Sequence, residues 1–317
     1  MAQQVFAYII HKNGIVDDTA LEMITAAGKL NTDASVTAVI AGTGAELDGV
    51  CKDVKSSFAE VWKIDNEALA HINAEVIRPM LTRILPKEGI VLIPHEHFGM
   101  DLAPGLSVKL DAAYLPDAVD FEGIEDGKLK AVREEYGGQV STHLLCDISQ
   151  GAVITLRPGS FKADESKSAN GNIVDKTAEA MAGGLAGGVR RFLEIVEAEV
   201  GDVDITKSDI LVSVGRGIED EDNLEMIFDL AKAMGADVSC SRPIVDAKWL
   251  EKSRQVGTSG KIVKPKVYMA LGISGSFQHL GGLKGAPFVV AVNKNPKAPI
   301  FQAADVGVVD DILDFIP

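Results

Sequence analysis

Cysteine is scarce in this chain of 317 residues, and the three that occur, Cys51, Cys146 and Cys240, form no Cys-x-x-Cys pair. Iron–sulfur clusters and structural zinc sites need several cysteine or histidine ligands at close spacing. The sequence therefore argues against both kinds of centre. Three widely separated cysteines are typical of reduced thiols in a cytoplasmic protein, which is the localisation we expect.

Long apolar runs and positive charge are also lacking. No stretch is long and apolar enough to span a bilayer, and the first ten residues lack the features of a signal peptide. Lysine and arginine number 31 against 46 aspartates and glutamates, which gives a formal charge of −15. Such a chain offers no broad basic surface to neutralise phosphates. We therefore expect neither membrane insertion nor a nucleic-acid partner.

Aromatic residues make up only 5% of the chain, although 46% of it is hydrophobic. Valine, isoleucine, leucine and alanine must therefore fill the core, which favours buried parallel strands. The length predicts two domains. We place the boundary in the polar segment 201–207, so that the domains comprise residues 1–205 and 206–317.

Both domains show an alternation of strand and helix patterns, which is typical of an α/β fold with a parallel sheet. The first domain has predicted strands at 5–10, 35–41, 61–64 and 89–94, and predicted helices at 18–30 and 73–85. A longer helical pattern covers 177–199, although it contains four glycines. The second domain has predicted strands at 209–214, 237–241, 267–273, 288–293 and 306–309, and a predicted helix at 222–234.

Two of these strands end in glycine-rich turns, at 215–217 and 272–282. Glycine allows a backbone to approach a phosphate closely, and the N–H groups at a helix start bind anions. Neither turn has the complete dinucleotide pattern G-x-G-x-x-G, because Asp220 occupies its third glycine position. Neither has the P-loop pattern. From the pattern alone, these segments are either ligand-binding turns or ordinary strand-to-helix turns.

Further polar side chains follow the other strands of the second domain. Arg242 comes after the strand at 237–241, a hydroxyl-rich loop occupies 255–261, and Asn293 ends the strand at 288–293. The carboxyl ends of parallel strands lie at one edge of a sheet. We therefore expect an arginine, several hydroxyls, an imidazole and an amide to meet at this edge.

Two other groups of polar residues receive structural interpretations. His95, Glu96, His97 and Asp101 could suggest a metal site, but their position just after a strand favours a polar loop. The acidic run 219–222 precedes a predicted helix, where carboxylates stabilise the helix dipole.

The second domain closely resembles the α subunit of electron-transfer flavoproteins, also called the FixB family. The similarity extends through GRG (215–217), SRPIVDAKWL (241–250), QVGTSGKIVKP (255–265), YMALGISGSFQHLGGLKG (268–285) and VAVNKNPKAPIFQAADVGVVDD (290–311). The first domain resembles the family more loosely, through its alternating elements and GMDLAPGLSVKL (99–110).

The resemblance implies a heterodimer with an electron-transfer flavoprotein β subunit. It implies a nucleotide-hydrolase-like α/β sheet domain at 1–205 that packs on this partner, and a parallel-sheet FAD-binding domain at 206–317. The β subunit carries AMP, or a second FAD in members that bifurcate electrons. The dimer takes electrons from an acyl-CoA dehydrogenase or from NADH and passes them to another flavoprotein or a quinone reductase.

The resemblance also implies which residues contact the FAD of this chain. Arg242 is expected against the isoalloxazine ring, Ser259 near N5, and His279 at the N1/O2 side. Ser259 follows Thr258, whereas many members of the family have glutamine and then threonine at these two positions. The complete set of expected FAD-binding residues is Arg216, Gly217, Ser241, Arg242, Gln255, Val256, Gly257, Thr258, Ser259, Gly272, Ser274, Gly275, Ser276, Gln278, His279, Asn293, Asp310 and Asp311.

Two functions of other classes are alternatives to an electron carrier. The first is an NAD-dependent dehydrogenase that uses the turn at 272–282, although the incomplete glycine pattern counts against it. The second is an adenine-nucleotide-binding regulator built on the N-terminal domain, in which Lys12, Asn13 and Gly14 follow the first strand.

Overall fold

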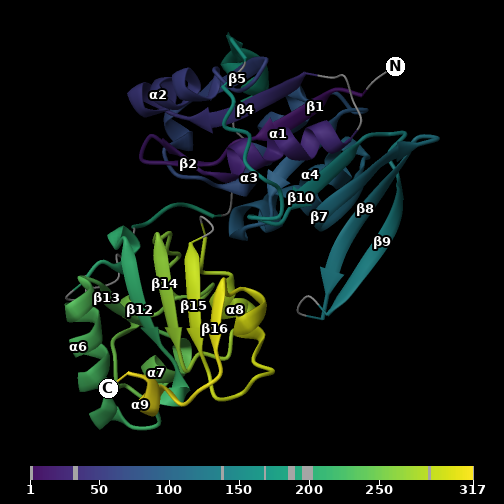
Figure 1. Ribbon diagram of the computed structural model, residues 1–317. Coiled ribbons are helices and arrows are strands. Elements are labelled where there is room, and N and C mark those ends of the chain that lie inside the picture. Colours follow the sequence, from purple (N-terminus) through teal and green to yellow (C-terminus); the bar gives the residue numbers. More distant parts are fainter. Residues whose placement is uncertain are drawn as a thin grey trace. The chain divides into compact units, whose positions relative to one another are not determined.

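The computed structural model describes residues 3–30, 35–136, 139–167, 169–184, 190–194, 203–284 and 287–316. The chain divides into two compact units, 1–193 and 194–317. Each unit is built on a sheet of its own, as Figure 1 shows. The α/β class and the two separate sheets confirm the fold predicted from the sequence.

The first unit contains a nine-stranded sheet that is parallel except at one end. β8 and β9 at that end are antiparallel to their neighbours. In spatial order, the strands are β11 (Asn172–Asp175), β5 (Glu60–Asp65), β4 (Val36–Gly42), β1 (Val5–Tyr8), β6 (Ile90–Pro94), β10 (Ala152–Leu156), β7 (Ala113–Glu125), β8 (Lys128–Glu135) and β9 (Val140–Asp147). A small hairpin joins β2 (His11–Lys12) and β3 (Ile15–Val16).

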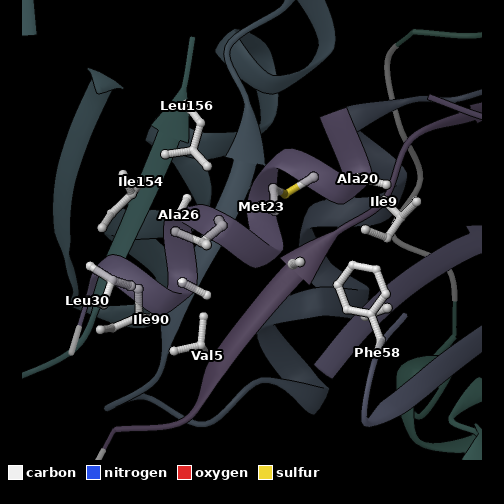
Figure 2. Close-up of a cluster of buried hydrophobic side chains, with 14 of the residues drawn as sticks. Val5, Ile9, Ala20, Met23, Ala26, Leu30, Phe58, Ile90, Ile154 and Leu156 are labelled. Carbon is white, nitrogen blue, oxygen red and sulfur yellow. The ribbon is translucent and has the colours of Figure 1, made fainter. Parts of the chain in front are cut away.

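Helices cover both faces of this sheet because side chains alternate along each strand. Val5 and Ala7 point to a core shared with α1 (Thr19–Lys29) and α2 (Gly44–Val54). Figure 2 shows Met23 and Ala26 of α1 in that core. Phe6 points to the opposite core, shared with α3 (Ala74–Ile84), α4 (His97–Leu110) and α5 (Thr177–Ala180).

The predicted long helix at 177–199 is wrong over the residues that the structure describes. Helix α5 ends at Ala180, and residues 190–194 are not helical. The reason is local, because Gly183 and Gly184 adopt φ angles of +83° and +82°. These left-handed conformations are accessible to glycine and incompatible with a continuing α-helix. Residues 185–189 and 195–199 lie outside the described residues.

The second unit contains a five-stranded parallel sheet, and its strands confirm those predicted. In spatial order, they are β13 (Asp237–Cys240), β12 (Ile210–Val214), β14 (Val267–Leu271), β15 (Phe288–Val292) and β16 (Val306–Val308). Numbered along the chain, this order is 2-1-3-4-5. It places a topological switch point between β12 and β14, where the chain departs in opposite directions from the two adjacent strands.

Different kinds of structure cover the two faces of this sheet. Helix α6 (Leu224–Met234) packs on one face through Ile227 and Ala231. Residues of loops and short helical turns, including Val256 and Ile300, fill the other. The remaining helical segments are short: η1 (Glu67–Leu69), η2 (Ile205–Lys207), η3 (Arg216–Ile218), η4 (Glu221–Asn223), α7 (Arg242–Asp246), η5 (Lys252–Arg254), α8 (Phe277–Leu280), η6 (Pro299–Gln302) and α9 (Ile312–Phe315).

No helix within the described ranges combines the length and the apolar character that a membrane crossing requires.

Candidate functional site

The switch point of the second sheet brings its two glycine turns into contact. The Gly215 N–H donates to Leu271 O at 2.8 Å, and the Gly217 N–H donates to Gly272 O at 3.1 Å. The turn after β12 therefore lies directly on the turn after β14. Ligands of open α/β sheets bind in the crevice beyond the carboxyl ends of strands at such a point.

Two cavities open at this edge and share Arg216 and Gly272. The larger cavity has a volume of about 450 Å³. The smaller has a volume of about 260 Å³. Because two lining residues are common to both, a single elongated ligand can occupy the two cavities across the switch point.

The loop at 255–261 forms one wall of the larger cavity and is fixed to its surroundings. The Val256 N–H donates to Cys240 O at 2.9 Å, and the Thr258 N–H donates to Gln278 O at 2.8 Å. Gln255 Nε2 donates to Ser259 Oγ at 2.9 Å. These bonds tie the loop to the end of β13 and to α8, so its hydroxyl groups are held in place at the cavity.

Arg242 supplies positive charge to the larger cavity. It begins α7 directly after β13, and its side chain is 69% exposed. Its Nε lies 3.4 Å from Asp246 Oδ2. An exposed ion pair of this kind contributes little free energy, so a ligand can draw the guanidinium away at small cost. The guanidinium stays protonated and is a permanent cation.

His279 contributes a largely buried imidazole to the wall of the larger cavity. The residue lines the larger cavity and is only 5% exposed. Its Nε2 lies 2.8 Å from the Tyr268 hydroxyl, whereas its Nδ1 is buried and has no hydrogen-bond partner of normal geometry. Burial lowers the pKa of His279 to about 4, although an interaction with the Val256 backbone opposes the shift. The ring is therefore neutral near pH 7.

The side chains of the smaller cavity are largely held by this chain itself. Asn293 Nδ2 donates to Ile273 O at 2.9 Å, and Asn293 Oδ1 accepts from the Asn295 N–H at 2.9 Å. Asp311 Oδ1 accepts from the Leu313 N–H at 3.1 Å and caps α9. Lys294 pairs with both Glu219 and Asp311. Asn293 and Asp311 thus shape this cavity.

Most of the residues expected to bind FAD line these cavities. The larger is lined by Arg216, Ser241, Arg242, Gln255, Val256, Gly257, Thr258, Ser259, Gly272, Ser274, Ser276, Gln278 and His279. The smaller is lined by Arg216, Gly217, Gly272, Asn293 and Asp311. Gly275 and Asp310 line neither.

Gly275 and Asp310 make contacts within this chain instead of lining a cavity. A Cβ on Gly275 would lie 2.3 Å from Ile300 N, so this glycine permits the close packing of η6. Asp310 Oδ1 accepts from the Asp311 N–H at 2.8 Å. Sequence reasoning did not assign several other lining residues to the site, although all are near expected site residues in the sequence. They are Glu219, Pro243, Asp246, Ile273, Lys294, Asn295 and Ile312.

The first unit offers a different arrangement at its own strand ends. His97 begins α4, and His95 Nδ1 lies 2.7 Å from Thr155 Oγ1. Arg157 forms ion pairs with Asp117 and Glu134. Over the described part of the chain, no group of histidine, cysteine, aspartate and glutamate side chains could hold a metal ion.

The chemistry of the second unit's crevice fits a flavin dinucleotide. The crevice has glycine turns that allow a pyrophosphate to approach closely, and a cation and hydroxyls for a polar ring. It also has the buried Nδ1 of His279, which has no hydrogen-bond partner of normal geometry among the described residues. A parallel sheet with such a crevice at its switch point is characteristic of proteins that bind nucleotide cofactors.

Comparison with known proteins identifies the family. Residues 5–181 match the electron transfer flavoprotein domain, and residues 204–284 match the electron transfer flavoprotein FAD-binding domain. The electron transfer flavoprotein subunit alpha of Thermoanaerobacterium thermosaccharolyticum is 31% identical over 99% of this chain and 96% of its own length.

Two further relatives belong to the same family. The electron transfer flavoprotein subunit alpha of Methylophilus methylotrophus is 33% identical over 96% of this chain and 94% of its own length. Protein FixB of Clostridium saccharobutylicum is 29% identical over 99% of this chain and 94% of its own length. The chain belongs to the alpha-subunit (FixB) family of electron transfer flavoproteins, whose role is electron transfer.

Proposed function

We propose that this chain binds one FAD across the switch point of its second unit and carries electrons as the α subunit of a heterodimeric electron-transfer flavoprotein. The observation that carries the proposal is that the two cavities share Arg216 and Gly272 in their walls. The larger cavity takes the isoalloxazine ring and the smaller takes the adenosine end. Ser274 and the glycine turns between the cavities would hold the pyrophosphate.

Three side chains act on the ring. FAD accepts and releases electrons, and its reduced ring carries extra negative charge around N1 and O2. Arg242 provides a fixed positive charge next to the ring, which stabilises its reduced form. Ser259 both donates and accepts hydrogen bonds, so it serves N5 in either oxidation state. His279 lies at the N1/O2 side.

The remaining assignments concern the rest of the cofactor. Residues 255–258 line the ring, and the loop bonds described above keep them rigid. Asn293 and Asp311 serve the ribose and adenine end, whereas Asp310 lines neither cavity. Both polar side-chain atoms of Asn293 already bond to Ile273 and Asn295. A contact with the cofactor must therefore use the second N–H of Nδ2 or the second lone pair of Oδ1.

The first unit serves as the platform for the β subunit, which carries AMP or a second FAD. Its strand ends are occupied by internal ion pairs such as Arg157–Asp117, which supports a scaffold more than a nucleotide site. The electron donor is an acyl-CoA dehydrogenase-type flavoprotein or NADH, and the acceptor is another flavoprotein or a quinone reductase. Free thiols at Cys51 and Cys240 support a cytoplasmic location.

The test is to produce this chain together with its β subunit and to measure the flavin content of the purified complex. We expect a yellow complex that contains FAD. Arg216→Ala and Arg242→Ala should each lower the FAD content or affinity, whereas Arg191→Ala, an exposed arginine outside the crevice, should not. A colourless complex without FAD would refute the proposal.

Counting flavins separates the two forms of the heterodimer. Two FADs per heterodimer, with reduction by NADH, would indicate electron bifurcation. One FAD and one AMP, with reduction by an acyl-CoA dehydrogenase and its substrate, would indicate a simple carrier.

A further inference from the structure

A buried chain of hydrogen bonds runs from the core of the second sheet to the cavity wall. The Tyr268 hydroxyl donates to Ser213 Oγ at 2.7 Å and lies 2.8 Å from His279 Nε2. Ser213 belongs to β12, Tyr268 to β14 and His279 to α8. Ser213 and Tyr268 are completely buried, and neither lines a cavity.

Packing does not account for the hydroxyl of Tyr268. A phenylalanine would fill almost the same volume without a polar atom to desolvate, and burying a polar group costs free energy unless it is hydrogen-bonded. Burial raises the pKa of Tyr268, so the phenol stays neutral. It then has one proton and two lone pairs to share among its neighbours.

Of the three residues joined by these bonds, only His279 lines the cavity. A neutral imidazole carries a proton on one ring nitrogen only, and the bond made by one nitrogen decides which nitrogen that is. His279 Nε2 is engaged by Tyr268, and Nδ1 has no partner of normal geometry. A buried polar atom without a partner is unfavourable, which a ligand contact would relieve.

We infer that Tyr268 is a positioning residue for the cofactor, because its hydroxyl orients the imidazole of His279 and sets the position of the ring proton. Tyr268 acts only through His279. Ser213 supports it by accepting a hydrogen bond from the phenol. The inference rests on the proposed function, since His279 is taken to contact FAD.

The test uses the full chain with its β subunit and compares Tyr268→Phe with Tyr8→Phe. Tyr8 is an equally buried tyrosine in the first unit, and burial also raises its pKa. Loss of one neutral hydrogen bond corresponds to roughly a fivefold effect. We therefore expect Tyr268→Phe to weaken FAD binding by about fivefold and to change the flavin reduction potential. Tyr8→Phe should leave both unchanged.

A double-mutant cycle separates positioning from a general loss of stability. If Tyr268 acts through His279, Tyr268→Phe should have no further effect on FAD affinity in a His279→Gln background. Equal effects in both backgrounds would overturn the inference, as would unchanged affinity and potential in the single variant.

A second measurement does not need the cofactor. With 15N-labelled histidine, the ring nitrogens of His279 report the position of the proton, and His279→Gln assigns their signals. We expect Tyr268→Phe to shift these signals in FAD-free protein, and Ser213→Ala to shift them less. Unshifted signals would contradict the inference. Absence of FAD from the wild-type complex would instead refute the proposed function and leave this measurement interpretable.

Discussion

Gly272 faces Gly217 so closely that a Cβ built on Gly272 would lie 2.7 Å from the Gly217 Cα. Gly272 also has a φ of +63°. Both features require glycine, and both belong to the switch point that joins the two cavities. The two glycine turns thus fix each other's position.

Gly272→Ala should therefore destabilise the protein through backbone strain and a steric clash. Left-handed backbone alone costs about 1–2 kcal/mol for a residue other than glycine. With the clash, we expect a loss of roughly 3 kcal/mol or more in the free energy of unfolding, and loss of FAD. Gly235→Ala is the control, because Gly235 has a φ of +64° and no atom within 4 Å of its added Cβ. If urea unfolding showed equal losses of unfolding free energy in Gly272→Ala and Gly235→Ala, the clash would be contradicted.

His279 should make stability depend on pH. Burial lowers its pKa to about 4, so below an ordinary pKa of about 6.5 the unfolded chain binds a proton that the folded chain does not. Stability is then fully present above about pH 6.5 and falls as the pH drops toward 4. We expect a contribution of about 2 kcal/mol between pH 7 and pH 5. His279→Gln should flatten this part of the profile in urea unfolding of the FAD-free chain. An unchanged profile in His279→Gln would contradict this assignment.

The first unit should lose stability at lower pH through Asp117. Burial alone would raise the pKa of Asp117, but hydrogen bonds from Arg157 at 3.0 and 2.7 Å outweigh it and hold the pKa below its usual value. The contribution is present above the ordinary pKa of about 4 and is lost as the pH falls further. Asp117→Asn should cost about 1–2 kcal/mol near neutral pH and progressively less below about pH 4.

The matched control for that variant is Asp111→Asn. Asp111 and Asp117 share a φ of +57°, which asparagine tolerates, and Asp111 is exposed. This control should change the free energy of unfolding by little near neutral pH. If the two variants behaved alike in unfolding experiments, the Arg157 bonds would not be the cause.

Arg190 should hold the end of the first unit in place. Its guanidinium donates to Asp101 at 2.7 and 3.1 Å and to Glu75 at 3.1 Å. Phe192 nearby is already 47% exposed. Arg190→Ala should therefore loosen this segment and make chymotrypsin cleave at Phe192 faster than in wild type. Arg191→Ala, the change at the adjacent position, should leave the rate unchanged. Unaltered cleavage in Arg190→Ala would show that these ion pairs do not anchor the segment.

Strands were more predictable than helices in this chain. Helix α4 was not predicted, because it contains Gly99, Pro104 and Gly105, which disfavour helices. Its glycines are explained by contacts that appear only in three dimensions. A Cβ on Gly99 would lie 1.9 Å from Pro94 O, and one on Gly105 would lie 2.4 Å from Arg78 Nε. Tertiary packing overrides local preference at these positions.

The site was predictable where it depends on strand ends and less so where it depends on side-chain partners. The glycine turns and the loop at 255–261 follow directly from the order of strands and turns along the chain. The bond from Asn293 to Ile273 and the bond from Tyr268 to Ser213 join segments 20 and 55 residues apart in the sequence. In the sequence, Tyr268 looks like an ordinary apolar strand residue. Only the folded structure shows that its hydroxyl contacts His279.

The decisive experiment is a crystal structure of the heterodimer with FAD. We expect an FAD that spans both cavities, with its isoalloxazine ring at Arg242, Ser259 and His279 and its adenosine end near Asn293 and Asp311. An FAD bound elsewhere on the chain, or a ring from which those three side chains point away, would contradict it.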